Sequence, residues 1–160
     1  EDRAPYSEWS RQGLLTLTEG DVIDYSFIRQ RVLADSKTYK ILEIGFDPWN
    51  AELLCNQQLG LEDGLDVVEV RQTIGAMGPA TSELEKLLHA GRIHHNGNPI
   101  LAWMAGNCVV RSDANDNIMP SKKTSTGRID GIAAVIIGLT RAVLNPRVGS
   151  VYDTRGMLTL

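Results

Sequence analysis

The sequence predicts an α/β fold in which a mixed sheet is flanked by helices. Residues 41–47 and 66–70 are short, apolar and rich in β-branched residues, as buried strands are, and a helical stretch lies between them. This strand–helix–strand order implies two parallel strands joined by a right-handed crossover. Residues 126–144 form the longest apolar helical pattern, which indicates a helix packed deeply against the sheet.

The composition is that of a globular protein of one domain. The chain has 160 residues, a net charge of −4 at pH 7 and two cysteines. Cys55 and Cys108 match no metal-ligand spacing, so we expect free thiols. The negative charge argues against a protein that bulk positive charge holds on DNA or on a membrane, although metal ions can supply positive charge locally. The longest apolar run is too short to cross a bilayer.

Two helices are expected before the first strand, and one directly after it. Residues 5–13 are typical of a short helix that Gly13 ends, and Asp24 is a suitable cap for a helix that runs to about residue 36. Pro48 has the fixed φ of a first helical turn, so the sequence predicts a helix over about residues 50–58.

The second half of the chain is predicted to begin with a loop and two helices. Residues 71–78 contain glycines and lack periodicity, which indicates a loop. Pro79 is expected to start a helix that Gly91 ends. Asn98 and Pro99 then form a cap and a first turn, so a further helix is expected after them.

A hairpin is predicted before the last helix. Residues 108–111 and 118–119 are strand-like, and the polar run 113–117 between them is typical of a turn. Because a hairpin is antiparallel, it makes the predicted sheet mixed. Residues 121–127 are polar and contain two lysines.

Two aspartates lie where chemistry is expected. Asp47 follows the first strand, at the edge where open α/β sheets place their ligands. Asp130 lies in the first turn of the apolar helix, where a buried charge is costly unless a partner neutralises it. A divalent cation shared with Asp47 would do so, because Mg²⁺ prefers oxygen ligands. The spacing alone favours the simpler interpretation that each aspartate does no more than cap a helix, because capping aspartates are common.

Four motifs occur in one order along the chain. They are IGFDPWNA at 44–51, LEKL at 84–87, HNGNPILAWMAGN at 95–107 and RIDGI at 128–132. Together they resemble the C-terminal nuclease domain of the large terminase subunits of tailed bacteriophages, over residues 6 to about 142. The resemblance implies a ribonuclease H-like fold and an endonuclease that uses two Mg²⁺ or Mn²⁺ ions to cut double-stranded phage DNA during packaging. Asp47 and Asp130 fall on two of the family's three catalytic aspartates, which favours the metal-ligand interpretation.

The sequence also departs from the family. The family's first catalytic aspartate lies on a strand upstream of Tyr6, and nothing before Tyr6 here can form that strand. The chain also lacks the Gly-x-x-x-x-Gly-Lys loop of the packaging ATPase. The resemblance therefore implies a partial nuclease domain over residues 1–144, incomplete at its N-terminus, a C-terminal tail over residues 145–160, and crippled catalysis in the chain as it stands.

The resemblance implies partners in the cytoplasm of the bacterial host and no contact with a membrane. They are double-stranded phage DNA, the terminase ATPase domain of the same parent chain, the small terminase subunit and the portal protein. Four side chains are candidate DNA contacts, although each also fits an ordinary loop or surface position: His95, Lys122, Lys123 and Arg128. Trp49 and Trp103 are expected in the core.

Two alternatives remain open. The chain could be a non-catalytic docking module that holds the packaging motor against the portal or the DNA, in which case it would not bind Mn²⁺ through the two aspartates. It could also be a junction resolvase on the same fold, which would prefer four-way junctions to linear duplex.

Overall fold

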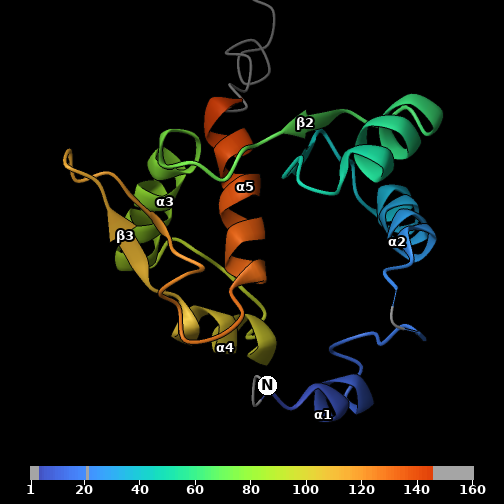
Figure 1. The fold of residues 1–160 in the computed structure, drawn as a ribbon, viewed down its shortest axis with the longest axis horizontal. Coiled ribbons are helices and arrows are strands. Elements are labelled where there is room, and N and C mark those ends of the chain that lie inside the picture. The colour runs from blue at the N-terminus through green and yellow to red at the C-terminus, as the bar shows by residue number, and fades with distance from the viewer. Residues whose placement is uncertain (1–3, 21, 146–160) are drawn as a thin grey trace, which may run out of the picture.

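The computed structural model of the protein describes residues 4–20 and 22–145 (Figure 1). The predicted α/β class is confirmed, because helices flank two small sheets. Of the predicted C-terminal tail, residues 146–160 lie outside the described part of the chain. None of the described helices is both long and apolar enough to span a membrane.

The elements follow one another in a mixed order of helices and strands. They are α1 (Tyr6–Arg11), α2 (Tyr25–Thr38), β1 (Ile44–Phe46), the π-helix η1 (Leu53–Glu62), β2 (Val67–Glu69), α3 (Ile74–His89), α4 (Pro99–Asn107), β3 (Val110–Ser112), β4 (Ile118–Pro120) and α5 (Asp130–Leu144).

Both predicted strand pairs are present. Strands β1 and β2 are parallel, with Ile44 opposite Val67, and strands β3 and β4 are antiparallel, with Val110 opposite Pro120. Within residues 4–20 and 22–145 the two pairs form separate two-stranded sheets instead of one continuous mixed sheet. The reason is the position of the helices between them: α5 packs on β1 and on α3, and α3 packs on β4 (Figure 1).

The predicted loop at residues 71–78 is wrong, because α3 already begins at Ile74 and contains Pro79 in its interior. Thr73 caps this helix, and its hydroxyl oxygen accepts a hydrogen bond from the backbone N–H of Ala76 at 3.3 Å. Met77 is only 1% exposed. Burial of this side chain against α5 and β4 residues outweighs the poor helix propensity of the surrounding glycines and proline.

The helix predicted directly after Pro48 begins later than expected. Trp49 and Asn50 lie in a turn that ends at Ala51, and the φ of 59° at Asn50 is left-handed and cannot belong to an α-helix. The helical segment η1 follows from Leu53. The predicted start of the last helix at residue 126 is also early, since α5 begins at Asp130.

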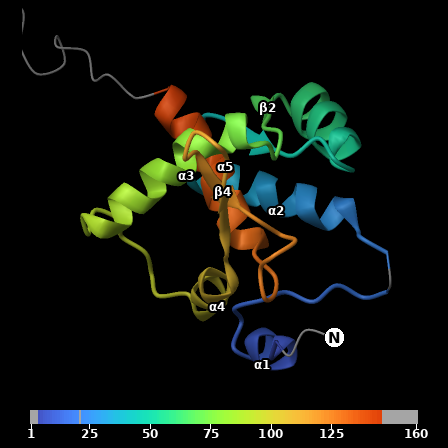
Figure 2. The same ribbon diagram turned by 60° about the vertical axis from the view of Figure 1, so that its left-hand side comes forward.

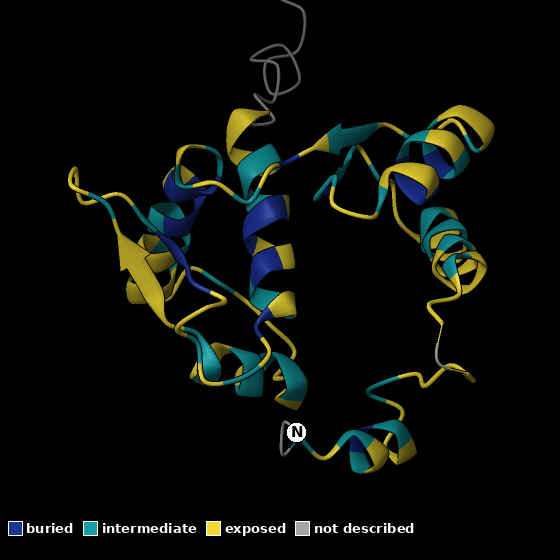
Figure 3. Cartoon of the chain, in the orientation of Figure 1, coloured by how far each residue is buried: buried dark blue, intermediate teal, exposed yellow. Residues whose placement is uncertain are grey.

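The buried side chains form two hydrophobic clusters (Figure 3). The first lies between α3, α5 and β4 and consists of Val70, Met77, Ala80, Met119, Ile136 and Ile137. The second lies between β1 and η1 and consists of Phe46, Leu54, Cys55 and Leu59. Helix α1 is attached elsewhere, beside α4 (Figure 2), where the rings of Trp9 and Trp103 meet edge to face with centroids 5.5 Å apart.

Both cysteines are free, as the sequence predicts. Cys55 is buried in the second cluster, and Cys108 is half-buried after α4. Burial raises the pKa of both thiols.

Strand β1 and helix α5 meet in a tight contact. A Cβ atom on Gly45 would lie 2.7 Å from Cγ2 of Ile137, so only glycine fits at this position. Beside it, Glu43 accepts hydrogen bonds from Nε of Arg141 and from Nδ2 of Asn145, each at 2.7 Å. The hydrogen bond from Arg141 to Glu43 raises the pKa of the guanidinium. We call this contact the β1–α5 seam.

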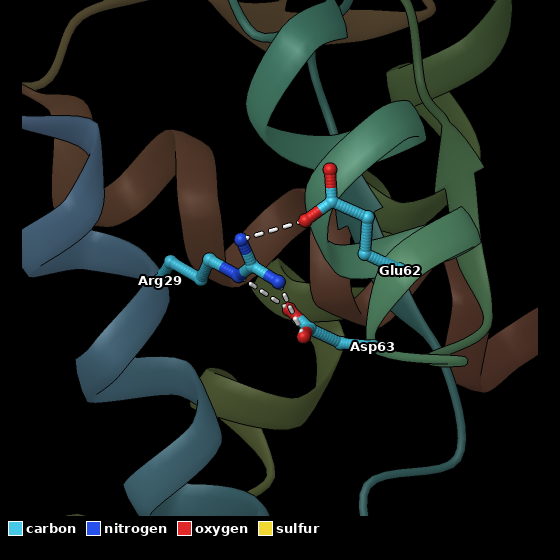
Figure 4. Close-up of polar contacts among 3 residues, drawn as sticks. All are labelled: Arg29, Glu62 and Asp63. Atoms are coloured by element: carbon cyan, nitrogen blue, oxygen red, sulfur yellow. Dashed lines mark hydrogen bonds and ion pairs between the residues drawn. The ribbon is translucent and has the colours of Figure 1, made fainter.

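None of the residues of helix α2 is fully buried, although Tyr25 and Val32 pack half-buried on the second cluster, and ion pairs add to this attachment. Arg29 donates from Nε and Nη2 to both carboxylate oxygens of Asp63, at 2.7 and 2.6 Å, and its Nη1 lies 2.8 Å from Glu62 Oε2 (Figure 4). Such two-pronged pairing is the strongest form of an ion pair. The hydrogen bond from Arg29 lowers the pKa of Asp63. This Arg29 clamp joins α2 to the end of η1.

We predict that Gly45→Ala lowers the free energy of unfolding by about 1–3 kcal/mol, because the added methyl group would overlap the β-branched side chain of Ile137. Thermal or denaturant unfolding measures the change. Gly138→Ala is the matched control, since a Cβ there meets no atom within 4 Å and alanine should raise helix stability by roughly 0.5–1 kcal/mol. Equal stability of the Gly45→Ala and parent chains would contradict the tight seam.

We predict that the Arg29 clamp makes stability depend on pH in the acid range. Because Asp63 has a lowered pKa in the folded chain, its pairing stabilises the fold above the usual carboxyl pKa of about 4 and is lost as the pH falls through the lowered value. Thermal unfolding of the parent should therefore weaken more steeply below about pH 4 than that of Asp63→Asn.

Arg29→Gln should lower the unfolding temperature at pH 7, whereas Arg31→Gln should leave it nearly unchanged. Arg31 lies on the same helix and pairs with Asp35, but its side chain is 73% exposed, and such surface pairs contribute little. Identical effects of the two substitutions would argue against the clamp.

Candidate functional site

Asp47 lies at the carboxyl end of β1, as the sequence predicts, and is half-buried. Its Oδ1 accepts a hydrogen bond from the backbone N–H of Trp49 at 3.2 Å. Its Oδ2 accepts one from Nε2 of Gln72, which follows β2. Because β1 and β2 are parallel, both residues belong to the same edge of the sheet, and the amide of Gln72 fixes the direction of the Asp47 carboxylate.

Asp130 is the first residue of α5, but its side chain is 59% exposed. The hydrophobic burial at this point belongs to Ile129, which is 2% exposed. The Asp130 carboxylate therefore escapes the cost of a buried charge, and the N-terminus of α5 is a favourable neighbour for it. Nζ of Lys122 lies 3.4 Å from Oδ1 of Asp130.

Each aspartate contacts a side chain that lines one hollow of about 390 Å³. The lining residues are Gln72, Arg111, Met119, Pro120, Ser121, Lys122, Lys123 and Thr124. Gln72 binds Asp47, and Lys122 pairs with Asp130. The β1–α5 seam lies at Ile137, seven residues after Asp130, which is roughly 10 Å along the helix. The side chains that line the hollow therefore link two acids that come from different elements.

The hollow is positively charged in a chain of net negative charge. Arg111, Lys122 and Lys123 line it, and none of its lining residues is acidic. Nη2 of Arg111 lies 3.3 Å from the sulfur of Met119, so the guanidinium lies across the hairpin strands. Three cations in one hollow are suited to a phosphate group.

The turn that carries the two lysines is held by its own backbone. The N–H of Ser121 donates to the carbonyl of Val109 at 2.8 Å, which extends the hairpin pairing by one step. The hydroxyl of Ser125 donates to the carbonyl of Ser121 at 2.7 Å and accepts from the N–H of Val109 at 3.0 Å. The hairpin therefore fixes where Lys122 and Lys123 leave the backbone.

The other two candidate DNA contacts are His95, which lies on a separate loop, and Arg128, which lies close to Asp130 in the sequence. His95 is exposed between α3 and α4, and its Nδ1 accepts a hydrogen bond from the N–H of Gly97 at 3.0 Å, so this nitrogen shapes its own loop. Arg128 is exposed two residues before Asp130, and its carbonyl accepts a hydrogen bond from Nδ2 of Asn107 at 3.4 Å. That bond ties the approach to α5 to the end of α4.

Sequence reasoning missed two residues of this region and misplaced a third. Gln72 could have been found, because it is a polar residue that lies three positions after the end of the second parallel strand. Arg111 was assigned to a strand, and nothing in the sequence indicated that it would face the lysines. The expectation that Trp49 is a core residue is wrong, since its side chain is 82% exposed. Trp103, by contrast, is half-buried against Trp9.

The donor chemistry of the two aspartates fits a hard divalent cation. Mg²⁺ is commonly held by one or two carboxylates, with water and substrate phosphates completing its shell. Within the described residues, histidine, cysteine and acidic side chains do not gather in groups of three or more that could hold an ion. Asp47 and Asp130 can thus offer two carboxylates, and Lys122 would compete with a cation for Asp130.

The fold and the hollow define an α/β domain in which basic side chains line one hollow and two acidic side chains each contact a residue of that lining. Residues 1–145 match the family described as "Terminase large subunit, endonuclease domain". The chain belongs to this family, and the predicted resemblance is confirmed.

Two related proteins are longer than this chain. It is 36% identical over 141 residues to "Terminase, large subunit" of Enterobacteria phage HK97, covering 88% of this chain and 28% of that protein. It is 34% identical over 150 residues to "Protein YmfN" of Escherichia coli (strain K12), covering 92% of this chain and 32% of that protein. The chain therefore spans about a third of the length of these relatives.

The fold agrees with a solved structure. The crystal structure of the HK97 bacteriophage large terminase matches with a TM-score of 0.79 at 36% identity, over 88% of this chain and 29% of that one. The predicted ribonuclease H-like α/β fold, with small sheets flanked by helices, is confirmed by this likeness.

Proposed function

We propose that the chain is a metal-dependent endonuclease domain that hydrolyses double-stranded DNA during phage genome packaging. Membership of the terminase endonuclease family supports this class of reaction. The observation that carries the proposal is the arrangement of Asp47 and Asp130, each in contact with a residue that lines the same positively charged hollow.

Asp47 and Asp130 would hold the Mg²⁺ or Mn²⁺ ions, two of them in the complete domain. Bound metal would activate a water molecule and stabilise the leaving oxygen of the phosphodiester. The protein's own contribution at Asp47 is orientation. Gln72 and the N–H of Trp49 each occupy one carboxylate oxygen from the protein side, so the free lone pairs point outward.

Lys122 would change partners when DNA binds. Its side chain is 55% exposed and pairs with Asp130 across 3.4 Å, so it balances that negative charge and can leave without breaking a buried contact. A DNA phosphate in the hollow offers the ammonium a new partner at the moment when a cation takes over Asp130.

The remaining cations would hold the DNA backbone without reading its sequence. Arg111 and Lys123 line the hollow with Lys122, and phosphate contacts of this kind fix the position of a duplex. His95 and Arg128 stay candidate DNA contacts on the basis of sequence. We also propose three partners in the host cytoplasm: the packaging ATPase domain, the small terminase subunit and the portal protein. These are partners expected of a whole terminase, and the chain spans only part of its relatives.

We predict that Asp47→Asn and Asp130→Asn each weaken Mn²⁺ binding by at least about 10-fold, because each removes a charged oxygen ligand. Isothermal titration with Mn²⁺ measures the affinity, and nicking of supercoiled plasmid with Mn²⁺ measures the reaction. Asp116→Asn is the matched control: Asp116 lies in the hairpin turn at a φ of 59°, which asparagine also tolerates.

We expect slow nicking by the 160-residue chain, since only two of the family's three catalytic aspartates have counterparts in the sequence. Robust nicking that Asp130→Asn abolishes would contradict the expected impairment while supporting the role of Asp130. Mn²⁺ binding unaffected by either aspartate substitution would overturn the metal site and favour the docking module.

We predict that Arg111→Ala, Lys122→Ala and Lys123→Ala each weaken binding to a DNA duplex and reduce the slope of log affinity against log salt concentration by roughly one. The physical reason is the loss of one phosphate contact and its released counterion. Fluorescence anisotropy at several NaCl concentrations measures both quantities. Lys86→Ala is the control, because Lys86 is an exposed lysine on α3 that pairs with Glu83. Equal salt slopes for all four variants would argue against the hollow as the phosphate site.

A further inference from the structure

The side chain of Trp49 is unusually exposed for a tryptophan. It is 82% exposed, whereas Trp9 is 6% exposed in its contact with Trp103. Tryptophan carries the largest apolar surface of any side chain, and burying it is favourable. A single exposed apolar residue is ordinary on a protein surface, so exposure alone does not define a site. The surroundings of Trp49 give it significance.

The turn that presents Trp49 is anchored on both sides of this residue. The N–H of Trp49 donates to Oδ1 of Asp47 at 3.2 Å. The next residue, Asn50, has a φ of 59°, and its carbonyl accepts a hydrogen bond from the hydroxyl of Tyr25 at 2.9 Å. Tyr25 belongs to α2, which the Arg29 clamp ties to η1 (Figure 4). The backbone that carries the indole is therefore anchored, while the Trp49 side chain is exposed to solvent.

We propose that Trp49 is a DNA-contacting residue that packs against the nucleotide next to the phosphate served by Asp47. This inference rests on the proposed function, because it takes Asp47 as a carboxylate of the nuclease site. The hydrogen bond between the two residues puts the base of the Trp49 side chain beside that carboxylate. A duplex with a phosphate near Asp47 would extend past the turn that carries Trp49, because this hydrogen bond joins the two residues.

Nucleic acid suits this position better than a protein partner does. Trp49 is continuous with Asp47, and Asp47 is joined through Gln72 to a hollow lined by three cations. An aromatic face beside positive charge is the combination with which proteins hold sugar and base surfaces together with phosphates. The contact would be tolerant of sequence, because every nucleotide of a duplex presents a similar deoxyribose surface at its backbone.

Tryptophan fluorescence tests the inference without any need for cleavage. Trp9 is buried and Trp103 packs against it, so a mixed-sequence DNA duplex should quench mainly the emission of Trp49. The titration uses Ca²⁺ in place of Mg²⁺, and anisotropy of a dye on the DNA follows binding independently. We expect quenching in the parent chain and little of it in Trp49→Phe.

The substitutions separate the ring from the charges. Trp49→Ala should weaken DNA binding roughly 10-fold and leave the salt slope unchanged, because the ring makes no ion pair. Trp49→Phe, which keeps an aromatic face, should recover most of that affinity. Leu61→Ala is the matched control, since Leu61 is 84% exposed near the end of η1 and should not affect binding. Unchanged thermal unfolding shows that each variant is folded.

The experiment distinguishes failure of this inference from failure of the proposed function. If the parent chain binds DNA by anisotropy but its fluorescence does not change, or if Trp49→Ala binds like the parent, the inference is overturned and the proposed function stands. If the parent chain does not bind the duplex at all, the proposed function fails and the inference fails with it. If Leu61→Ala weakens binding as much as Trp49→Ala does, the effect is general loss of apolar surface, and the inference is again overturned.

Discussion

The β1–α5 seam is the contact on which the rest of the structure depends. The strand can approach the helix only because Gly45 lacks a Cβ atom, and the pairing of Glu43 with Arg141 and Asn145 secures the approach. Phe46 belongs to one hydrophobic cluster and Ile137 to the other. The seam therefore brings together the two hydrophobic clusters of the described residues.

The seam also fixes the position of Asp47 relative to helix α5. It fixes β1, and so Asp47, against the middle of α5, while Asp130 lies at the start of the same helix. The separation along α5 is bridged by Gln72 on one acid and Lys122 on the other.

The sequence predicted those parts of the fold that local patterns determine. The parallel strand pair, the hairpin, the cap at Asp24 and the long apolar helix all follow from periodicity and capping residues close in sequence. The start of α3 was wrong because the burial of Met77 is a tertiary effect that overrides weak local helix propensity. The turn after Pro48 was wrong because nothing in the sequence requires the left-handed conformation of Asn50.

The candidate site divides in the same way. Asp47 could be placed from the sequence because its position depends only on where a strand ends. The exposure of Asp130, its pairing with Lys122 and the position of Arg111 depend on how the hairpin and the following turn pack, which local patterns do not contain. The resemblance to terminases supplied the expected pairing of two distant acids, the sequence already indicated Lys122 and Lys123 as phosphate contacts, and the geometry added Arg111 beside them.

The attachment of α2 affects the turn beside Asp47, at the carboxyl end of the parallel strands. No residue of α2 is fully buried, and the helix is attached by the Arg29 ion pairs together with the half-buried side chains of Tyr25 and Val32, which pack on the second cluster. When it detaches it takes the Tyr25 hydroxyl away from Asn50 and loosens the turn beside Asp47. Salt would weaken the ion pairs of Arg29 and, through Tyr25, would loosen the turn that follows β1. Helix α2 would thus affect the position of Asp47 although it contributes none of the acidic or basic groups of the hollow.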